Sequence, residues 1–258
     1  MRKMENTEKP INSILRIKNI LECVVSGQER FTDISKRLNL SLSTTHRLIK
    51  SLQITGFVTQ DPLNRHYFLG PLISKLASNI NASHLGLIVC AHRDMEELWR
   101  LTGETVSLAT RIGMQTVQLE ELPSHHDLKI TTGRIFAAPV YAGAAGKVLL
   151  SQLDGKDLKT IIKKVELVRF APNTIIDKEK LMEEVEKVKN YGYSISYSEV
   201  RRGASSISVP IRNYFCEIAL TVYGPDSRFS PEETDVIEAI KRSSIRISNK
   251  VRDLTEIK

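Results

Sequence analysis

The sequence predicts an α+β fold in two parts: an N-terminal winged helix-turn-helix domain, and a helical linker that leads to a mixed domain of helices and strands. Three observations predict this fold. The first third of the chain shows three helical runs followed by two short strand-like runs. In the remaining two thirds of the chain, strand-like runs are interspersed with helical runs. The excess positive charge of the chain lies in its first third. A chain of 258 residues has room for two such domains.

The charge is distributed unevenly along the chain. Residues 1–80 contain 12 Lys and Arg against 6 Asp and Glu, whereas residues 81–258 contain 25 against 24. A basic segment followed by a nearly neutral one is typical of a nucleic-acid-binding module attached to a domain with another role.

The composition also excludes several classes of protein. The longest apolar stretch near the middle, residues 85–91, is far shorter than the roughly 20 residues of a membrane-spanning helix. The three cysteines are far apart and form no C-x-x-C pair, which argues against a disulfide framework or a cysteine zinc site. Residues 1–9 are charged and are expected to form a mobile tail rather than a signal peptide. We therefore expect a cytoplasmic protein without a cofactor and without membrane contact.

Three helices are expected first. Apolar residues at helical spacing predict a helix over residues 12–26, which Gly27 ends. A second, short helix is expected to be capped by Thr32. A turn at residues 39–40 leads to the third helix, for which Ser41 is a suitable N-cap.

The third helix has the pattern of a DNA-recognition helix. Its core face is expected to hold Thr45, Leu48, Ile49 and Leu52, and its other face has short hydroxyl side chains near the start, followed by Arg47. Short side chains let a helix approach the major groove by its N-terminal end, and arginine can form two hydrogen bonds with a guanine edge. The predicted DNA contacts of this helix are Ser41, Ser43, Thr44, Thr45, His46, Arg47 and Lys50.

The residues after this helix predict a wing. Gly56 ends the helix, and residues 57–59 and 66–69 are expected to be strands joined by a turn at residues 61–65. Arg65 at the tip is expected to enter the adjacent minor groove.

The remaining chain predicts the mixed domain. A linker helix is expected over residues 71–78 and a longer one over residues 85–101. Further helices are expected over residues 143–153, 158–165, 178–191 and from Ser230-Pro231 onward, and strands over residues 105–111, 116–122, 193–197, 205–212 and 217–223.

Ordered motifs along this chain resemble the IclR family of bacterial transcription regulators. In the first third they are Ser13-Ile14-Leu15-Arg16, then Phe31-Thr32-Asp33-Ile34-Ser35, then Leu40 to Leu52, Gly56-Phe57-Val58 and Tyr67-Phe68-Leu69-Gly70. In the rest they are Pro139 to Lys147, Tyr191-Gly192-Tyr193, Glu199 with Gly203, Ser208-Val209-Pro210-Ile211 and Gly224-Pro225. The resemblance covers about nine tenths of the chain.

This resemblance implies a DNA-binding domain over residues 10–78 and a GAF-like effector-binding and oligomerisation domain over residues 79–258. It also implies an effector pocket formed by Ala144, Ala145, Ser196, Ser206, Thr221 and Tyr223. Some family members have an acid at the position of Ser196 and a thiol at that of Ser206, and Tyr223 replaces a small residue. Backbone amides at a helix start, together with hydroxyls, suit an anion such as a carboxylate.

We therefore expect a ligand-responsive regulator, a repressor, that binds double-stranded operator DNA as a homodimer or homotetramer and binds a small organic acid. Two alternatives remain open: an enzyme with a DNA-binding appendage, and an effector-independent DNA-binding protein. Whether Tyr223 lines or fills the pocket is also open. The segment Gly143-x-x-Gly146-Lys147 lacks the residues of a phosphate loop, and His125-His126-Asp127 is expected to be a solvated turn rather than a metal site.

Overall fold

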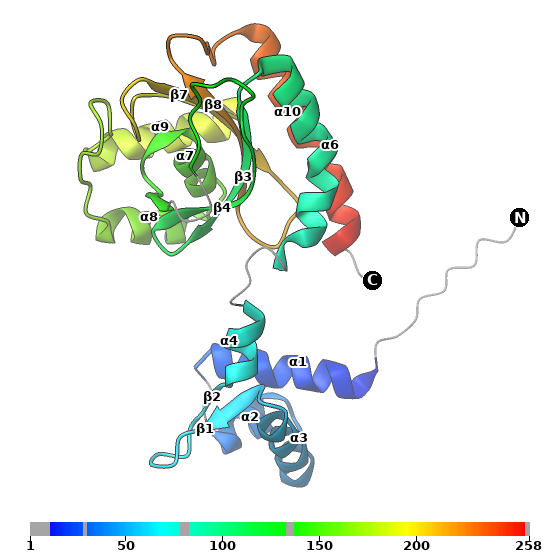
Figure 1. Cartoon of the computed structure of the whole chain (residues 1–258). Coiled ribbons are helices and arrows are strands. Elements are labelled where there is room, and N and C mark those ends of the chain that lie inside the picture. Colours follow the sequence, from blue (N-terminus) through cyan, green and yellow to red (C-terminus); the bar gives the residue numbers. More distant parts are fainter. Residues whose placement is uncertain (1–10, 28–29, 78–82, 133–136, 256–258) are drawn as a thin grey trace, which may run out of the picture. The chain divides into compact units, whose positions relative to one another are not determined.

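The computed structural model describes residues 11–27, 30–77, 83–132 and 137–255, and it divides the chain into two compact units between Ser83 and His84 (Figure 1). The expected tail at residues 1–9 and the expected boundary at residues 78–79 lie outside these described residues. Among the described helices, none combines the length and apolar character needed to cross a membrane.

The first unit is a winged helix. Helices α1 (Asn12–Val25), α2 (Phe31–Arg37) and α3 (Leu42–Ile54) precede the antiparallel strands β1 (Val58–Gln60) and β2 (Tyr67–Leu69), and α4 (Pro71–Ala77) follows. The helices and the hairpin share one core, whose buried members include Ile20, Ile34, Ile49, Leu52, Val58 and Tyr67. Burying such side chains contributes about 1.5–3 kcal/mol each, so packing rather than helix propensity stabilises these short elements.

Two details of this unit refine the sequence prediction. Helix α2 begins at Phe31, so Thr32 lies within the helix and does not cap it. The main chain at Gly70 lies so close to Gly56 that a Cβ atom at Gly70 would stand 2.2 Å from the Gly56 carbonyl oxygen. Only glycine fits this contact between the base of the wing and the end of α3.

The second unit is built around an antiparallel sheet with helices on both faces. Within the described residues the strand order is β5-β4-β3-β8-β7-β6, and neighbouring strands are antiparallel. Helices α6 and α10 cover one face, and α7, α8 and α9 lie on the other (Figure 1). The strands are β3 (Thr105–Ile112), β4 (Gln115–Leu122), β5 (Ala137–Pro139), β6 (Ser194–Tyr197), β7 (Ala204–Ile211) and β8 (Ile218–Pro225). The helices are α6 (Leu85–Thr102), α7 (Gly143–Ser151), α8 (Gly155–Lys164), α9 (Lys178–Tyr191) and α10 (Thr234–Thr255).

The start of α6 is held by the turn between β7 and β8. The His84 ring stacks on Phe215 with 5.4 Å between ring centroids, and His84 Nδ1 lies 3.1 Å from the Tyr214 hydroxyl oxygen. Burial lowers the pKa of His84 and raises the pKa of Tyr214 to about 12. Both groups are therefore neutral near pH 7, which suits a contact that is largely removed from water.

The starts of two helices in this unit differ from the sequence prediction by three or four residues, and one strand was not predicted. Helix α10 begins at Thr234, because Ser230 to Glu233 form a separate turn in which the Ser230 carbonyl accepts from the Glu233 amide. Helix α8 begins at Gly155, because the Asp154 side chain caps it by accepting from two backbone amides. The edge strand β5 was not predicted, since three residues are too few to show a periodicity.

Helix α7 packs tightly against the segment before it. A Cβ atom at Gly146 would lie 2.1 Å from the carbonyl oxygen of Val140, which is backbone and cannot move aside cheaply. We predict that Gly146→Ala destabilises the protein by about 1–3 kcal/mol or more, through overpacking. The measurement is thermal and denaturant unfolding of the full chain.

Gly155→Ala serves as the matched control, because a Cβ atom there meets nothing within 4 Å. An unchanged unfolding midpoint for Gly155→Ala and a lowered one for Gly146→Ala are expected. Equal stability of Gly146→Ala and the parent chain would contradict the close contact.

Candidate functional site

The start of α3 is organised by Ser41. Its hydroxyl accepts from the Thr44 amide at 3.2 Å and donates to the Thr44 hydroxyl at 2.8 Å, so Ser41 is the N-cap that the sequence predicts. The Ser43 hydroxyl lies 3.1 Å from the Ser41 hydroxyl. These hydrogen bonds fix the first turn, the part of a recognition helix that meets base edges. Ser41 therefore positions this turn, and its predicted contact with DNA stays a prediction.

The outward face of α3 presents a set of polar and basic side chains. Ser43, His46, Arg47 and Lys50 are exposed, and Thr44 is half-buried. Thr45 is different, because its side chain is completely buried and its hydroxyl donates to the Ser41 carbonyl at 3.0 Å. Thr45 therefore belongs to the core of the unit, and its inclusion among the predicted DNA contacts is corrected.

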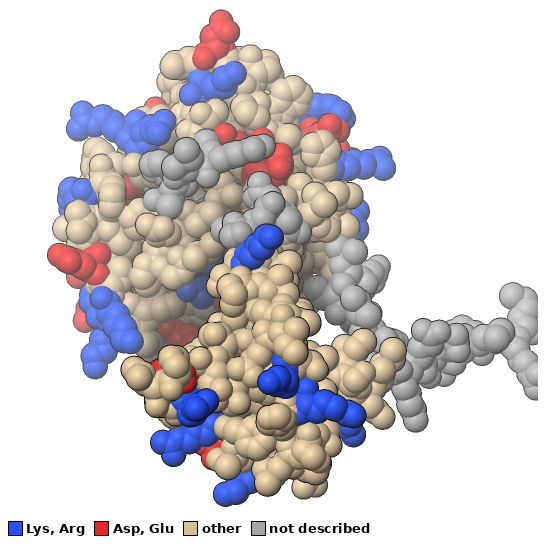
Figure 2. Space-filling model, turned by 60° about the horizontal axis from the view of Figure 1, so that its bottom comes forward, with Lys and Arg blue, Asp and Glu red and all other residues tan. Residues whose placement is uncertain are grey.

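The wing holds Arg65 at its tip. Arg65 has φ +61°, its amide donates to the Asp61 carbonyl at 3.0 Å, and its carbonyl accepts from Gln60 at 3.0 Å. The side chain is exposed. Figure 2 shows blue basic side chains spread over this unit with little red between them, as expected for a surface that meets phosphates.

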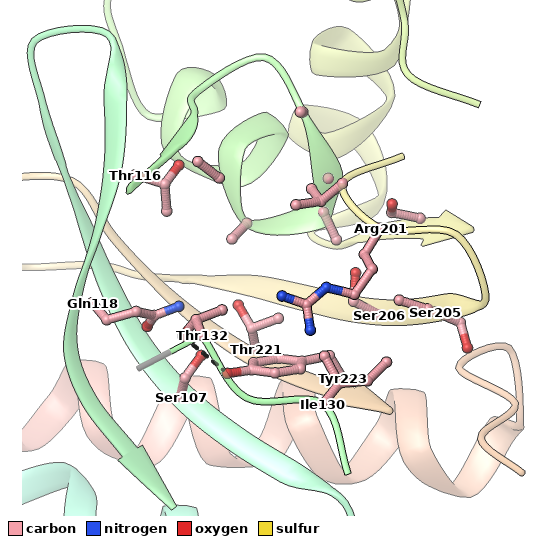
Figure 3. Close-up of a pocket in the computed structure, with 18 of the residues that line it drawn as sticks. Ser107, Thr116, Gln118, Ile130, Thr132, Arg201, Ser205, Ser206, Thr221 and Tyr223 are labelled. Carbon is pink, nitrogen blue, oxygen red and sulfur yellow. Dashed lines mark hydrogen bonds between the residues drawn. The ribbon is translucent and has the colours of Figure 1, made fainter. Parts of the chain in front are cut away.

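A cavity of about 760 Å³, including the space at its mouth, lies in the second unit between the start of α7 and the sheet (Figure 3). All six residues that the resemblance implies line it: Ala144, Ala145, Ser196, Ser206, Thr221 and Tyr223. Because space remains beside it, Tyr223 lines the cavity and does not fill it. The part of it that the centre of a water-sized sphere can reach is about 100 Å³, which is room for several water molecules or a small ligand.

The start of α7 is already partly occupied by a side chain. The Gly143 amide donates to Glu199 at 3.1 Å, and the other oxygen of Glu199 accepts from Lys147 Nζ at 2.6 Å. This pair is buried, with 2% and 8% of the two side chains exposed. The next amides, of Ala144 and Ala145, belong to the first helical turn and have no acceptor within the helix. They are the groups that α7 can offer to an anion.

The four polar residues of the predicted pocket differ in what they can donate. Within the described residues the hydroxyls of Ser196 and Ser206 have no hydrogen-bond partner. Ser208 donates to the Leu220 carbonyl, so the Thr221 hydroxyl, 2.9 Å from Ser208, donates to Ser208. Thr221 is thereby left as an acceptor.

The hydroxyl proton of Tyr223 is likewise used in a hydrogen bond within the protein. Its hydroxyl donates to Glu121, which also accepts from the amide and the hydroxyl of Thr132 at 3.0 and 2.6 Å. Burial, and then the neighbouring carboxylate of Glu121, hold the pKa of Tyr223 well above its usual value. The phenol is therefore neutral and presents its ring and oxygen lone pairs to the cavity. The sequence analysis did not foresee an acid at this point.

Arg201, an exposed residue, is the charged side chain of the described cavity lining, and the sequence analysis missed it. It follows β6 in a loop, lines the cavity, and turns its guanidinium group toward the interior (Figure 3). No ion pair of Arg201 occurs within the described part of the chain. The available signal was Arg201-Arg202 in the loop that follows a predicted strand, since loops at strand ends often bind ligands. The rings of His125 and His126 lie 4.3 Å apart between centroids, and no cluster of three potential metal-ligating side chains occurs among the described residues.

Two family models match this chain. The IclR helix-turn-helix domain matches residues 13–62, and the bacterial transcriptional regulator IclR C-terminal domain matches residues 80–249, more than half of the chain. The chain belongs to the IclR family. It is therefore a DNA-binding transcription regulator with a C-terminal effector-binding domain, as the sequence analysis expected.

The chain is similar to relatives along most of its length. The HTH-type transcriptional regulator KipR of Bacillus subtilis is 27% identical, over 96% of this chain and 99% of KipR. The HTH-type transcriptional repressor AllR of Escherichia coli is 30% identical, over 80% of this chain and 76% of AllR. An IclR homolog of Microbacterium hydrocarbonoxydans, solved in complex with 4-hydroxybenzoate, shares the fold with a TM-score of 0.60 and 23% identity, over 94% and 100% of the two chains.

Arg47 offers the sharpest test of the DNA interface. We predict that Arg47→Ala weakens binding to an operator, selected from random DNA by the full-length protein, by about 1–3 kcal/mol and relaxes the preference at one base pair. Lys18→Ala is the control, because it removes an exposed positive charge from α1, where Lys18 pairs with Glu22. A uniform loss over all DNA sequences would instead make Arg47 a phosphate contact.

Proposed function

We propose that this regulator is a cytoplasmic repressor, active as a homodimer or homotetramer, whose C-terminal cavity binds a small organic acid. The effector changes operator affinity, and the carboxylate of the effector lies between the Arg201 guanidinium and the amides of Ala144 and Ala145. The hydroxyls of Ser196 and Ser206 donate to the same group.

Arg201 is the observation on which this proposal rests. Among the described residues, Arg201 has no ion pair and the hydroxyls of Ser196 and Ser206 have no partner, so these groups and the adjacent helix N-terminus can donate to one ligand group. Arginine binds a planar carboxylate with two parallel hydrogen bonds, and the helix dipole favours negative charge at this end. Two acids lie nearby, but Glu199 is paired with Lys147, and neither Glu199 nor Glu121 is among the described residues that line the cavity.

The cavity also bears on the two alternative functions, an enzyme with a DNA-binding appendage and an effector-independent DNA-binding protein. Its described lining contains no His, Cys, Lys, Asp or Glu, so it lacks a nucleophile–base pair, which favours binding over catalysis. A formed cavity of ligand size favours an effector-responsive protein over an effector-independent one. Conversion of a bound acid into a new compound, followed by mass spectrometry, would favour the enzyme.

Solvent-exposed apolar side chains support the assembly of two or more chains. Leu76 on α4 and Leu85 and Val89 on α6 are between 58% and 67% exposed. Exposed apolar surface of this kind is typical of a protein–protein contact. A dimer would place two winged helices on the two halves of one operator, and linking the two sites raises affinity strongly. The relative AllR is named a repressor, which supports repression rather than activation for this chain.

The carboxylate contact is tested by two substitutions. We predict that Arg201→Gln and Ser206→Val each weaken binding of the responsive acid, found by a thermal-shift screen of small carboxylates. The loss is about 1.5–3 kcal/mol for each lost hydrogen bond to the charged group. Calorimetry on the full chain gives the affinity. Ligand-free operator affinity stays close to that of the parent protein.

Arg202→Gln is the matched control, since it removes the same charge one residue further along, at an exposed side chain outside the cavity lining. Equal acid affinity of Arg201→Gln and Arg202→Gln would sink the proposed carboxylate site.

Assembly is tested by Val89→Glu. This substitution places a charge on an exposed position, so it leaves the fold intact but disfavours an apolar contact between chains. We predict a smaller species in sedimentation and operator binding weakened at least tenfold. Val168→Glu, at a loop residue 51% exposed, is the control. An unchanged oligomer for Val89→Glu would exclude this part of α6 from the interface.

A further inference from the structure

The end of the cavity remote from Arg201 contains polar atoms that lack partners. Thr116 and Gln118 lie two residues apart on β4, so their side chains share the face that lines the cavity (Figure 3). Thr116 is only 6% exposed, and neither its hydroxyl oxygen nor the Gln118 amide oxygen has a hydrogen-bond partner in the described structure. A buried polar group without a partner is costly, so such groups are expected to meet a ligand or water.

The floor of the cavity adds two acceptors. The hydroxyl protons of Thr221 and Tyr223 are committed to Ser208 and Glu121, so both oxygens offer only lone pairs to a ligand. With the Gln118 amide oxygen, three acceptors face the same space. A carboxylate cannot satisfy them, because it has no proton to donate. A hydrocarbon cannot satisfy them either.

A hydroxyl group fits this end of the cavity better than other groups. It can donate to one acceptor and accept from Thr116 or from the Gln118 amide nitrogen at the same time. Threonine and glutamine side chains are themselves both donors and acceptors, which is the complement of an alcohol. No charged side chain among the described lining residues lies at this end, so an ammonium group would have no counterion within the cavity.

We propose that the effector is an acid with hydroxyl groups at the end away from its carboxylate, and that Thr116 and Gln118 bind those hydroxyls. This inference rests on the carboxylate site proposed above. It narrows the effector from organic acids in general to hydroxylated ones, and it assigns β4 to effector recognition.

Three six-carbon carboxylates test the class of ligand: gluconate, which has hydroxyls along its chain, hexanoate, which has none, and 6-aminohexanoate, which ends in an ammonium group. Calorimetry and thermal shift on the full chain are expected to show that gluconate binds at least tenfold more tightly than either of the others. Binding of hexanoate or 6-aminohexanoate as tight as that of gluconate overturns the proposal, and so does failure of gluconate to bind.

Thr116→Val and Gln118→Leu test the residues, because each keeps the approximate shape and removes the polar atoms. Each is expected to weaken gluconate binding about two- to tenfold and to leave hexanoate binding unchanged. The ligand-free melting temperature is expected to stay constant or rise, because a buried unpartnered group is removed. A merely structural role would lower the melting temperature instead.

Gln115→Leu is the control, since Gln115 is an exposed residue on the same strand outside the cavity lining. Unchanged gluconate affinity in Thr116→Val and Gln118→Leu would falsify the assignment of β4. If Arg201→Gln still weakens binding of all carboxylates in that case, the carboxylate site stands without it. If no carboxylate responds to Arg201→Gln, the carboxylate site fails as well.

Discussion

The buried ion pair of Lys147 and Glu199 is the interaction on which the C-terminal unit depends. One Glu199 oxygen accepts from Lys147, the other accepts from the first amide of α7, and the Glu199 carbonyl accepts from Thr174 at 2.6 Å. Removing one partner of such a pair typically costs 3–5 kcal/mol, because the other charge is left buried alone. Arg201 follows Glu199 by two residues, so the same pair fixes both the start of α7 and the loop that presents the guanidinium.

The N-terminal unit could be predicted from the sequence almost completely, because its signals are local. Ser41 caps α3 with its own side chain, and Gly56 ends the helix within the same stretch. The error at Thr45 was of another kind. A hydroxyl that returns to the carbonyl of the previous turn is indistinguishable in sequence from one that faces DNA, and only its burial separates the two roles.

The cavity could be predicted only in outline, because whether each polar group donates or accepts a hydrogen bond depends on residues far away in the chain. Thr221 is an acceptor because Ser208 lies across the β7–β8 pair, and Tyr223 is fixed by Glu121 from β4. Arg201 likewise reaches the cavity only once β6 and α7 are assembled around Glu199. The start of α10 shows the same limit: a serine and a proline suit a helix start, but here they form a separate turn.

The hairpin of β7 and β8 contributes residues to two separate regions of the C-terminal unit. Its strands contribute Ser206, Thr221 and Tyr223 to the cavity, and its turn places Phe215 against the ring of His84, where α6 begins. The hairpin therefore connects the cavity directly to the residue at which the C-terminal unit starts. Since binding free energies form a closed cycle, any effector that weakens operator binding by a given factor is itself bound more weakly, by the same factor, when the operator is bound.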